Sequence, residues 1–197
     1  METAIFCRHA ESELSALGIA NGDPRVPCGL TEYGDEQARA LGRALAGREI
    51  GLAVTSEFER TRRTAEIALS GRELPWLELA ELNDVRVGAF EGGNLDLYRE
   101  WAHAHQPEDR PPGEGESRAE VAARFAKGFH IVLERPELTI LVVMHGLAIS
   151  YLRETAAGSG PKAVHDAVPY ARPFEFGRDE LESAVERLDA WTKSPSW

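Results

Sequence analysis

An arginine and a histidine, Arg8 and His9, follow a short apolar run over residues 4–7. Such a run is typical of a buried strand, and ligands of open α/β sheets bind beyond the carboxyl ends of the strands. A guanidinium binds phosphate oxygens through paired hydrogen bonds. An imidazole that a neighbouring cation keeps neutral can act as a nucleophile. The pair therefore predicts phosphate chemistry, and the alternative is a strand end with two solvated polar residues.

Two later segments place residues of the same kind at the end of an expected strand. Arg60 follows residues 52–55 and lies in the first turn of a helix for which Ser56 is the expected N-cap, in a capping box. The N-terminus of a helix favours bound anions. His145 follows the nearly continuous aliphatic run 138–144, which is typical of a parallel strand buried on both faces. Three strand ends thus predict one basic site.

The elements that must position these residues alternate along the chain. Strands are expected at 4–7, 52–55, 74–79 and 138–144, the third at an edge because of Pro75. Helices are expected to begin near Thr31, Ser56, Asp96, Ser117 and Leu147. Alternating strands and helices predict an α/β fold. We expect a single domain over residues 1–197, a three-layer α/β/α sandwich with a mainly parallel central sheet.

Several segments of the chain are less regular. Residues 11–30 are expected to form a loop, and residues 84–116 the mouth of the site. Residues 178–191 fit either a helix or a hairpin. The tail over residues 192–197 is expected to fray. Loops are where binding residues concentrate, so the first two segments are expected to set the substrate.

Composition narrows the classes of partner. The 197 residues carry a net charge of -11, which argues against nucleic-acid or anionic membrane surfaces as partners. No apolar stretch is long enough to span a bilayer, and the residues after Met1 do not resemble a signal peptide. The two cysteines, Cys7 and Cys28, do not form a disulfide framework, so the cytoplasm is the expected compartment. An anionic substrate therefore requires a local cluster of arginines.

Taken in order, the motifs resemble those of the histidine phosphatase superfamily, the phosphoglycerate-mutase-like proteins. The resemblance covers residues 3 to about 150. The matching segments are Arg8-His9-Ala10, 30–38, 55–65, 112–117 with one residue inserted, and 143–146. Ala10 stands where the family's triplet ends in Gly.

The resemblance implies a fold, a reaction and a set of residues. His9 would be the nucleophile that becomes a phosphohistidine, and no cofactor or metal would be needed. The expected catalytic residues are Arg8, His9, Arg60, Asp84 and His145. The expected phosphate-binding residues are Arg8, Ser15, Arg60, His145 and Gly146. Phosphoryl transfer depends mainly on positioning and charge stabilisation, which two guanidiniums and an imidazole can provide.

Two carboxylates compete for the role of proton donor. The family places an acid shortly before a tract that corresponds here to residues 87–92, and counting back four from Gly88 gives Asp84. Glu81 is the competing carboxylate. A general acid must be protonated when the leaving oxygen departs, and a dianionic phosphate beside it favours that form. We expect Asp84 to be the donor.

The expected reaction is hydrolysis of a small phosphorylated metabolite whose identity the sequence leaves open. One alternative is a cofactor-dependent phosphoglycerate mutase, but Leu14 and Ser15 replace the Trp and Asn of the mutase branch. Another is a non-catalytic phosphate-binding module of the same fold. Neither cysteine has Arg six positions on, as a cysteine phosphatase requires, and no Gly-Lys-Ser/Thr P-loop is present. Whether the chain forms a homodimer is also left open.

Overall fold

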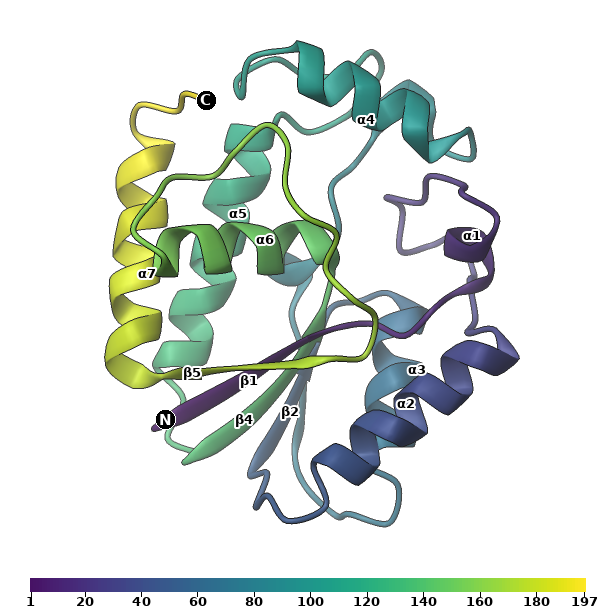
Figure 1. Ribbon diagram of the computed structural model, residues 1–197, viewed down its shortest axis with the longest axis vertical. Helices are drawn as coiled ribbons and strands as arrows, with labels where there is room; N and C mark the ends of the chain where they lie inside the picture. Colours follow the sequence, from purple (N-terminus) through teal and green to yellow (C-terminus); the bar gives the residue numbers. More distant parts are fainter.

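The computed structural model describes all 197 residues and is built around a five-stranded sheet (Figure 1). The strands are β1 (Thr3–Arg8), β2 (Leu52–Thr55), β3 (Trp76–Glu78), β4 (Thr139–Met144) and β5 (Pro173–Gly177). They lie in the order β3-β2-β4-β1-β5, and only β5 runs antiparallel to its neighbour. The prediction of a mainly parallel sheet with an edge strand after Pro75 is confirmed.

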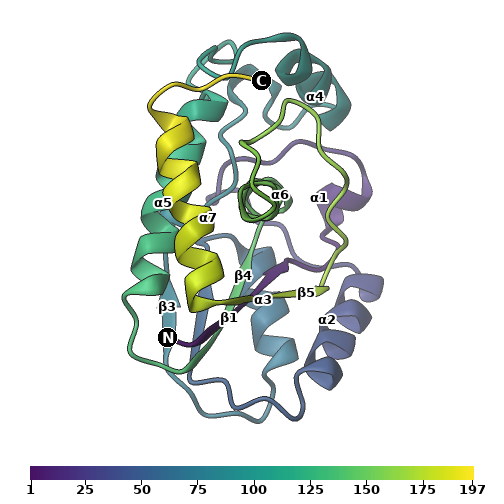
Figure 2. The ribbon, with the colours of Figure 1, turned by 60° about the vertical axis from the view of Figure 1, so that its left-hand side comes forward.

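Helices cover both faces of this sheet (Figure 2). One face is covered by α2 (Glu32–Ala44) and α3 (Glu59–Ala68), and the other by α5 (Arg118–Leu133), α6 (Gly146–Ala156) and α7 (Arg178–Thr192). Successive strand residues point to opposite faces. Phe6 and Val142 therefore belong to the larger core under α5–α7, whereas Ile5 and Leu141 belong to the smaller core under α2 and α3. The predicted three-layer α/β/α sandwich is confirmed.

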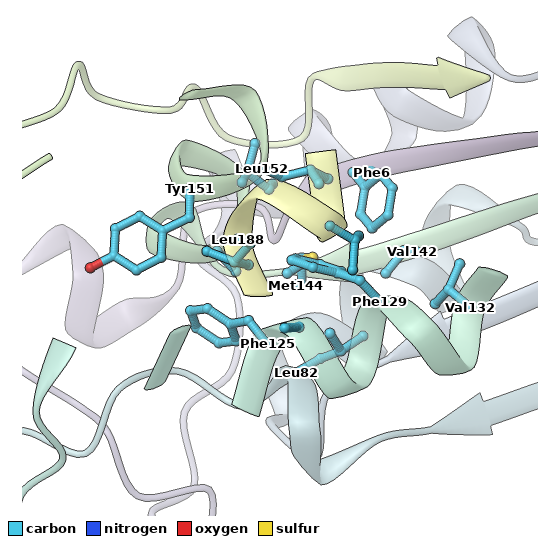
Figure 3. Close-up of a cluster of buried hydrophobic side chains, with 14 of the residues drawn as sticks. Phe6, Leu82, Phe125, Phe129, Val132, Val142, Met144, Tyr151, Leu152 and Leu188 are labelled. Atoms are coloured by element: carbon cyan, nitrogen blue, oxygen red, sulfur yellow. The ribbon is translucent and has the colours of Figure 1, made fainter. Parts of the chain in front are cut away.

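Aromatic and aliphatic side chains fill the larger core (Figure 3). The ring of Phe6 on β1 meets Phe129 of α5 and Phe176 of β5 edge-on, with both pairs of centroids 5.6 Å apart. Helix α5 also approaches the segment after β3 closely at Gly128. A Cβ atom there would lie 2.6 Å from Leu82 Cδ2, so any larger residue would force the Leu82 side chain to move. The close approach fixes the segment that leads to Asp84.

Shorter elements lie beyond the carboxyl ends of the parallel strands. They are α1 (Glu13–Ala16), two 3-10 turns (Ala80–Leu82 and Gly88–Phe90) and α4 (Leu95–Ala104). A further segment, residues 157–172, connects α6 to β5 and is called the strap below (Figure 1). The strap is pinned to β1, because the Ala171 N–H donates to the Arg8 carbonyl at 3.0 Å. None of the helices has the length and apolar composition needed to cross a membrane.

The helix starts confirm two predicted caps and correct a third. Thr31 accepts a hydrogen bond from Gly34 at the start of α2, and Ser117 opens α5 with a reciprocal capping box. Ser56 is not the N-cap of α3: the cap residue is Phe58, which makes no side-chain cap. The Ser56 hydroxyl is instead buried, 2.9 Å from His145 Nε2. A buried imidazole needs a hydrogen-bond partner, so this long-range contact takes precedence over the local cap.

Residues 178–191 lie within helix α7, so the helix is the correct one of the two alternatives and the hairpin is wrong. The strand before α7 pairs with β1 at the sheet edge. Residues 193–197 have no regular secondary structure; the Trp197 indole donates to the His105 carbonyl at 2.9 Å, and its ring lies 5.7 Å from that of Trp191. Within the expected loop over residues 11–30, α1 forms a single helical turn.

Candidate active site

The carboxyl ends of β1 and β4 bring two histidines to one level of the sheet. Arg8 is the register partner of Met144, so the next residues, His9 and His145, lie side by side with ring centroids 5.3 Å apart. A cavity of about 400 Å³ opens beside them. This volume is typical of small-ligand sites.

His9 is buried but lines the cavity, and its hydrogen bonds define its tautomer. Its Nδ1 lies 2.7 Å from the Ala10 carbonyl, which can only accept, so Nδ1 carries the hydrogen. Arg60 Nε donates to His9 Nε2 at 3.2 Å, so Nε2 presents a lone pair. Burial, followed by the charges of Arg60, His145 and Arg8, holds the pKa of His9 well below 6.5. The imidazole is therefore neutral near pH 7.

Arg60 is the hub of the polar contacts. It lies in the first turn of α3, is only 3% exposed, and stacks 4.0 Å from the centroid of the Phe58 ring. Its guanidinium donates to the side chain and carbonyl of Asn21. It also lies 3.3 Å from Asp84 Oδ2 and 3.3 Å from His145 Nδ1. Burial lowers the pKa of Arg60, although the carboxylate of Asp84 acts in the opposite direction.

The strap holds Arg8 in place. Arg8 Nη1 donates to the Val168 carbonyl at 2.8 Å, and the guanidinium lies 3.8 Å from the centroid of the Tyr170 ring. Its Nε is buried without a hydrogen-bond partner. Gly146 packs against the same side chain, since a Cβ there would lie 3.5 Å from Arg8. Both Arg8 and Gly146 line the cavity, and a donor without a partner is available to an anion there.

His145 lies behind this group and has no exposed surface. Its Nε2 contacts the Ser56 hydroxyl, and its Nδ1 lies 3.4 Å from Asp84 Oδ2. Burial, followed by the charges of Arg60 and then Arg124 and Arg8, holds the pKa of His145 well below 6.5. The imidazole does not belong to the cavity lining, so its contact with this site runs through Arg60 and Asp84.

The two candidate proton donors lie in different surroundings. The Asp84 carboxylate lines the cavity and is 26% exposed. Glu81 does not line it; its Cβ packs against α5 at Gly128. Arg124 fixes the segment between them by donating to the main-chain carbonyls of Glu81, Asn83 and Asp84. Only Asp84 of the two can therefore reach a ligand in this cavity.

Ser15 lies in α1 at the cavity wall, with its hydroxyl 2.8 Å from that of Ser12. Two residues near the site were not predicted from the sequence, Asn21 and Tyr170. Asn21 lies in the glycine- and proline-rich loop over residues 11–30, and its polar side chain among turn residues is the one signal that could have indicated it. Tyr170 lies in the strap, far in sequence from every predicted strand end, and no pattern indicates its contact with Arg8.

The arrangement suits phosphate chemistry. Two arginines, Arg8 and Arg60, lie beside a neutral imidazole whose Nε2 is unprotonated and accepts a hydrogen bond from Arg60. Donors fixed in advance stabilise charge that develops on phosphoryl oxygens, and they do not need to reorganise during the reaction. No group of three or more His, Cys, Asp or Glu side chains is placed to hold a metal ion.

A three-layer α/β/α sandwich with two arginines and two histidines gathered at its strand ends defines a class of phosphoryl-transfer proteins. The family model described as "Histidine phosphatase superfamily (branch 1)" matches residues 4–187. The chain belongs to the histidine phosphatase superfamily, as the motifs predicted.

Individual relatives include both phosphatases and mutases. A "Probable phosphoglycerate mutase" of Photorhabdus laumondii is 31% identical over 159 residues, which cover 77% of this chain and 73% of the relative. An adenosylcobalamin/α-ribazole phosphatase of Salmonella typhimurium is 38% identical over 84 residues, 43% of this chain and 41% of the relative. The crystal structure of an α-ribazole phosphatase from Shigella flexneri superposes with a TM-score of 0.76 at 26% identity, covering 88% of this chain and 89% of that one.

Proposed function

We propose that this protein is a metal-independent phosphomonoesterase that hydrolyses a small phosphorylated metabolite through a phosphohistidine at His9. The observation that carries the proposal is the state of His9. The imidazole is buried and neutral, its Nε2 lone pair borders the cavity, and Arg8 and Arg60 lie beside it. The family membership and the phosphatases among the relatives support the same reaction.

In the first step, His9 Nε2 attacks phosphorus while the bond from phosphorus to the leaving oxygen breaks. The Ala10 carbonyl accepts the Nδ1–H hydrogen bond and so stabilises the positive charge that develops on the ring. Arg8 and Arg60 hold the phosphoryl oxygens. Asp84, in its protonated form, gives its proton to the leaving oxygen, which departs as an alcohol.

In the second step, water attacks the phosphohistidine and the bond between nitrogen and phosphorus breaks. The Asp84 carboxylate takes a proton from the water, so the acid is regenerated for the next cycle. Inorganic phosphate leaves and His9 returns to its neutral form. His145 contacts Arg60 and Asp84 but does not line the cavity, so we assign it to positioning these two side chains.

A mutase is the second candidate, because one of the relatives described above is named as a phosphoglycerate mutase. Two cavity residues favour hydrolysis instead. Leu14 and Ser15 line the site where the mutase branch has Trp and Asn. A serine hydroxyl donates one hydrogen bond, whereas an asparagine amide donates two, so phosphate is held less firmly between transfers.

Both cysteines are buried and free, which fits a reducing compartment, and we propose the cytoplasm. Burial without any compensating charge raises the pKa of the Cys7 thiol. Cys7 lies next to Arg8 in sequence, yet it remains a protonated thiol and is not the nucleophile.

The experiment is to trap the phosphoenzyme with EDTA present throughout. Wild-type protein and His9→Ala are incubated with radiolabelled p-nitrophenyl phosphate and quenched. Wild type should hydrolyse the substrate and carry an acid-labile, base-stable label, and His9→Ala should do neither. Label on Ser, Asp or Cys, or activity that disappears on chelation and returns with a divalent metal, contradicts the proposal.

A further inference from the structure

The cavity continues beyond the phosphate-binding arginines to a second basic end. Four arginines line the cavity as a whole, against two carboxylates, Asp84 and Asp166. Two of these arginines, Arg99 and Arg118, are not among the residues assigned to the phosphoryl group. His103 and His165 line the same end. In a protein with a net charge of -11, this is a local excess of positive charge that the reaction at His9 does not use.

Arg118 is the least compensated of these cations. Its residue is 6% exposed, and it makes no ion pair with any carboxylate. Its guanidinium hydrogen-bonds two uncharged groups, the Tyr151 hydroxyl at 2.7 Å and His165 Nε2 at 3.2 Å. It is also the first residue of α5, where the positive end of the helix dipole opposes a cation. A buried charge is costly unless it is paired.

Two further polar atoms around Arg118 lack partners. The Tyr98 hydroxyl, on a residue 3% exposed, is buried beside the Arg118 guanidinium without a hydrogen bond of standard geometry, and His165 Nδ1 is buried without a partner. The nearest carboxylate to His165 Nδ1 is that of Glu154, at 3.9 Å. Buried polar groups without partners are rare, and each needs an explanation. Tyr98 and His165 both line the cavity, as does Arg118, so these buried polar atoms and the Arg118 charge lie in one part of its wall.

Helix α6 fixes the separation between the two ends of the cavity. Gly146, at its start, packs against Arg8, and Tyr151, five residues later, accepts a hydrogen bond from Arg118. A rise of 1.5 Å per residue puts these positions about 7.5 Å apart along the helix axis. Figure 3 shows the Tyr151 hydroxyl at the rim of the larger core, directed away from the other labelled side chains. The hydroxyl is thus free to hold Arg118 at the cavity.

The lining of the cavity is also partly apolar. It includes Leu14, Leu95, Leu147 and Val168, which come from four different segments. A ligand that reaches from Arg8 to Arg118 would therefore place its charges at the ends and its carbon skeleton in the middle.

We propose that the substrate carries a second anionic group, a carboxylate or a phosphate, which binds Arg118 and the Tyr98 hydroxyl while the scissile phosphate lies between Arg8 and Arg60. The proposal rests on the phosphatase function proposed above. It adds that the physiological substrate is a phosphomonoester with a second anionic group at the Arg118 end of the cavity. The second anion supplies the negative charge that Arg118 lacks and accepts the free hydroxyl hydrogen of Tyr98.

The test compares matched substrates that differ only in the distal group. One pair is 5-phosphooxypentanoate and 5-hydroxypentyl phosphate; the other is 1,4-butanediol bisphosphate and 4-hydroxybutyl phosphate. We expect wild-type kcat/KM to favour the anionic member of at least one pair by about tenfold or more, mostly through KM. The two pairs distinguish a carboxylate subsite from a phosphate subsite. If wild type hydrolyses the two members of each pair with nearly equal kcat/KM, the proposal is refuted, and no variant is needed to reach that conclusion.

Variants then assign the effect to this end of the cavity. In Arg118→Met the ratio should fall toward one, because the methionine keeps the packing and removes the charge. Tyr98→Phe, which removes one hydroxyl, should lower the ratio by a smaller factor. Arg110→Gln is the control, since it also removes a cation near the start of α5 but one that is exposed and does not line the cavity. Its ratio should equal that of wild type.

Three outcomes distinguish the possible failures. If Arg118→Met is less stable but keeps the wild-type ratio, Arg118 only ties α5 to α6 and the subsite is refuted. If wild type does not hydrolyse p-nitrophenyl phosphate at all, the phosphatase function fails first. If wild type hydrolyses p-nitrophenyl phosphate but shows no preference for the anionic substrates, the second anion site is refuted and the phosphatase function stands.

Discussion

Replacing Asp84 with Asn removes the proposed proton donor and leaves most of its surroundings intact. The Val85 N–H donates to Asp84 Oδ1 at 3.0 Å, and an amide oxygen can accept the same hydrogen bond. The contacts that change are those of Oδ2, which lies 3.3 Å from Arg60 Nη2 and 3.4 Å from His145 Nδ1; toward Arg60 the new amide would place a donor against a donor. Asp84 is 26% exposed, so the side chain has room to adjust and the fold should be kept.

The size of the effect depends on the leaving group. General acids contribute roughly a hundredfold to ten-thousandfold, so kcat for an alkyl phosphate should fall by at least about a hundredfold. That corresponds to about 2.7 kcal/mol of transition-state stabilisation. p-Nitrophenolate leaves with little protonation, so the same variant should lose much less on p-nitrophenyl phosphate. The pH profile of wild type, which should favour acid, should flatten in Asp84→Asn.

Glu81→Gln is the matched control. It removes a carboxylate three residues away that does not line the cavity, and its kcat should stay near that of wild type on both substrates. Steady-state kcat for glycerol 3-phosphate and p-nitrophenyl phosphate between pH 5 and 8 measures both variants. A large loss in Glu81→Gln with little change in Asp84→Asn would refute the assignment. An equal loss on both substrates in Asp84→Asn would indicate positioning of Arg60 instead of proton transfer.

Two further predictions follow from the same geometry. The free energy of unfolding should fall as pH drops from 7 to 5, because burial is the main cause that holds the pKa values of His9, His145 and His165 below 6.5 in the folded protein. At pH 6 the unfolded chain binds about 0.8 of a proton more at each of them, a slope of about 1 kcal/mol per pH unit each. Urea unfolding between pH 5 and 7 measures this change in the free energy of unfolding. A free energy of unfolding that does not depend on pH would contradict the prediction. Phosphoglycerate interconversion should be negligible beside phosphate release, given Leu14 and Ser15; faster interconversion than release overturns that expectation.

The fold could be predicted where local pattern and long-range packing agree. The run before His145 is aliphatic on both faces because β4 is buried between two layers of helices, and the sequence shows this directly. Ser117 caps α5 because its partner lies three residues away. Ser56 has the same local pattern, but its hydroxyl contacts His145, 89 residues later in the chain. No local pattern distinguishes these two serines.

The residues of the site also fall into two groups, those that the sequence predicts and those that it does not. Arg8, His9 and Arg60 could be predicted because strand ends and helix starts place them, and the order of strands in a parallel sheet brings these ends together. Asn21 and Tyr170 could not, since each is brought to the site by a loop whose path depends on contacts far away in sequence. The surface that binds the substrate is therefore formed in part by the loop over residues 11–30 and by the strap, whose paths local sequence patterns do not predict.

Although the chain as a whole is acidic, few of its carboxylates lie beside the arginines of the cavity. If acidic side chains neutralised the cavity arginines, an incoming phosphate would have to displace them and lose part of its binding energy. Asp84 partly neutralises Arg60, 3.3 Å away, but Arg8 Nε has no partner and Arg118 makes no ion pair. The free protein therefore carries the desolvation cost of Arg8 and Arg118. A bound anion offsets that cost, while a neutral ligand does not. Selectivity for phosphate esters thus arises as much from the missing carboxylates as from the arginines themselves.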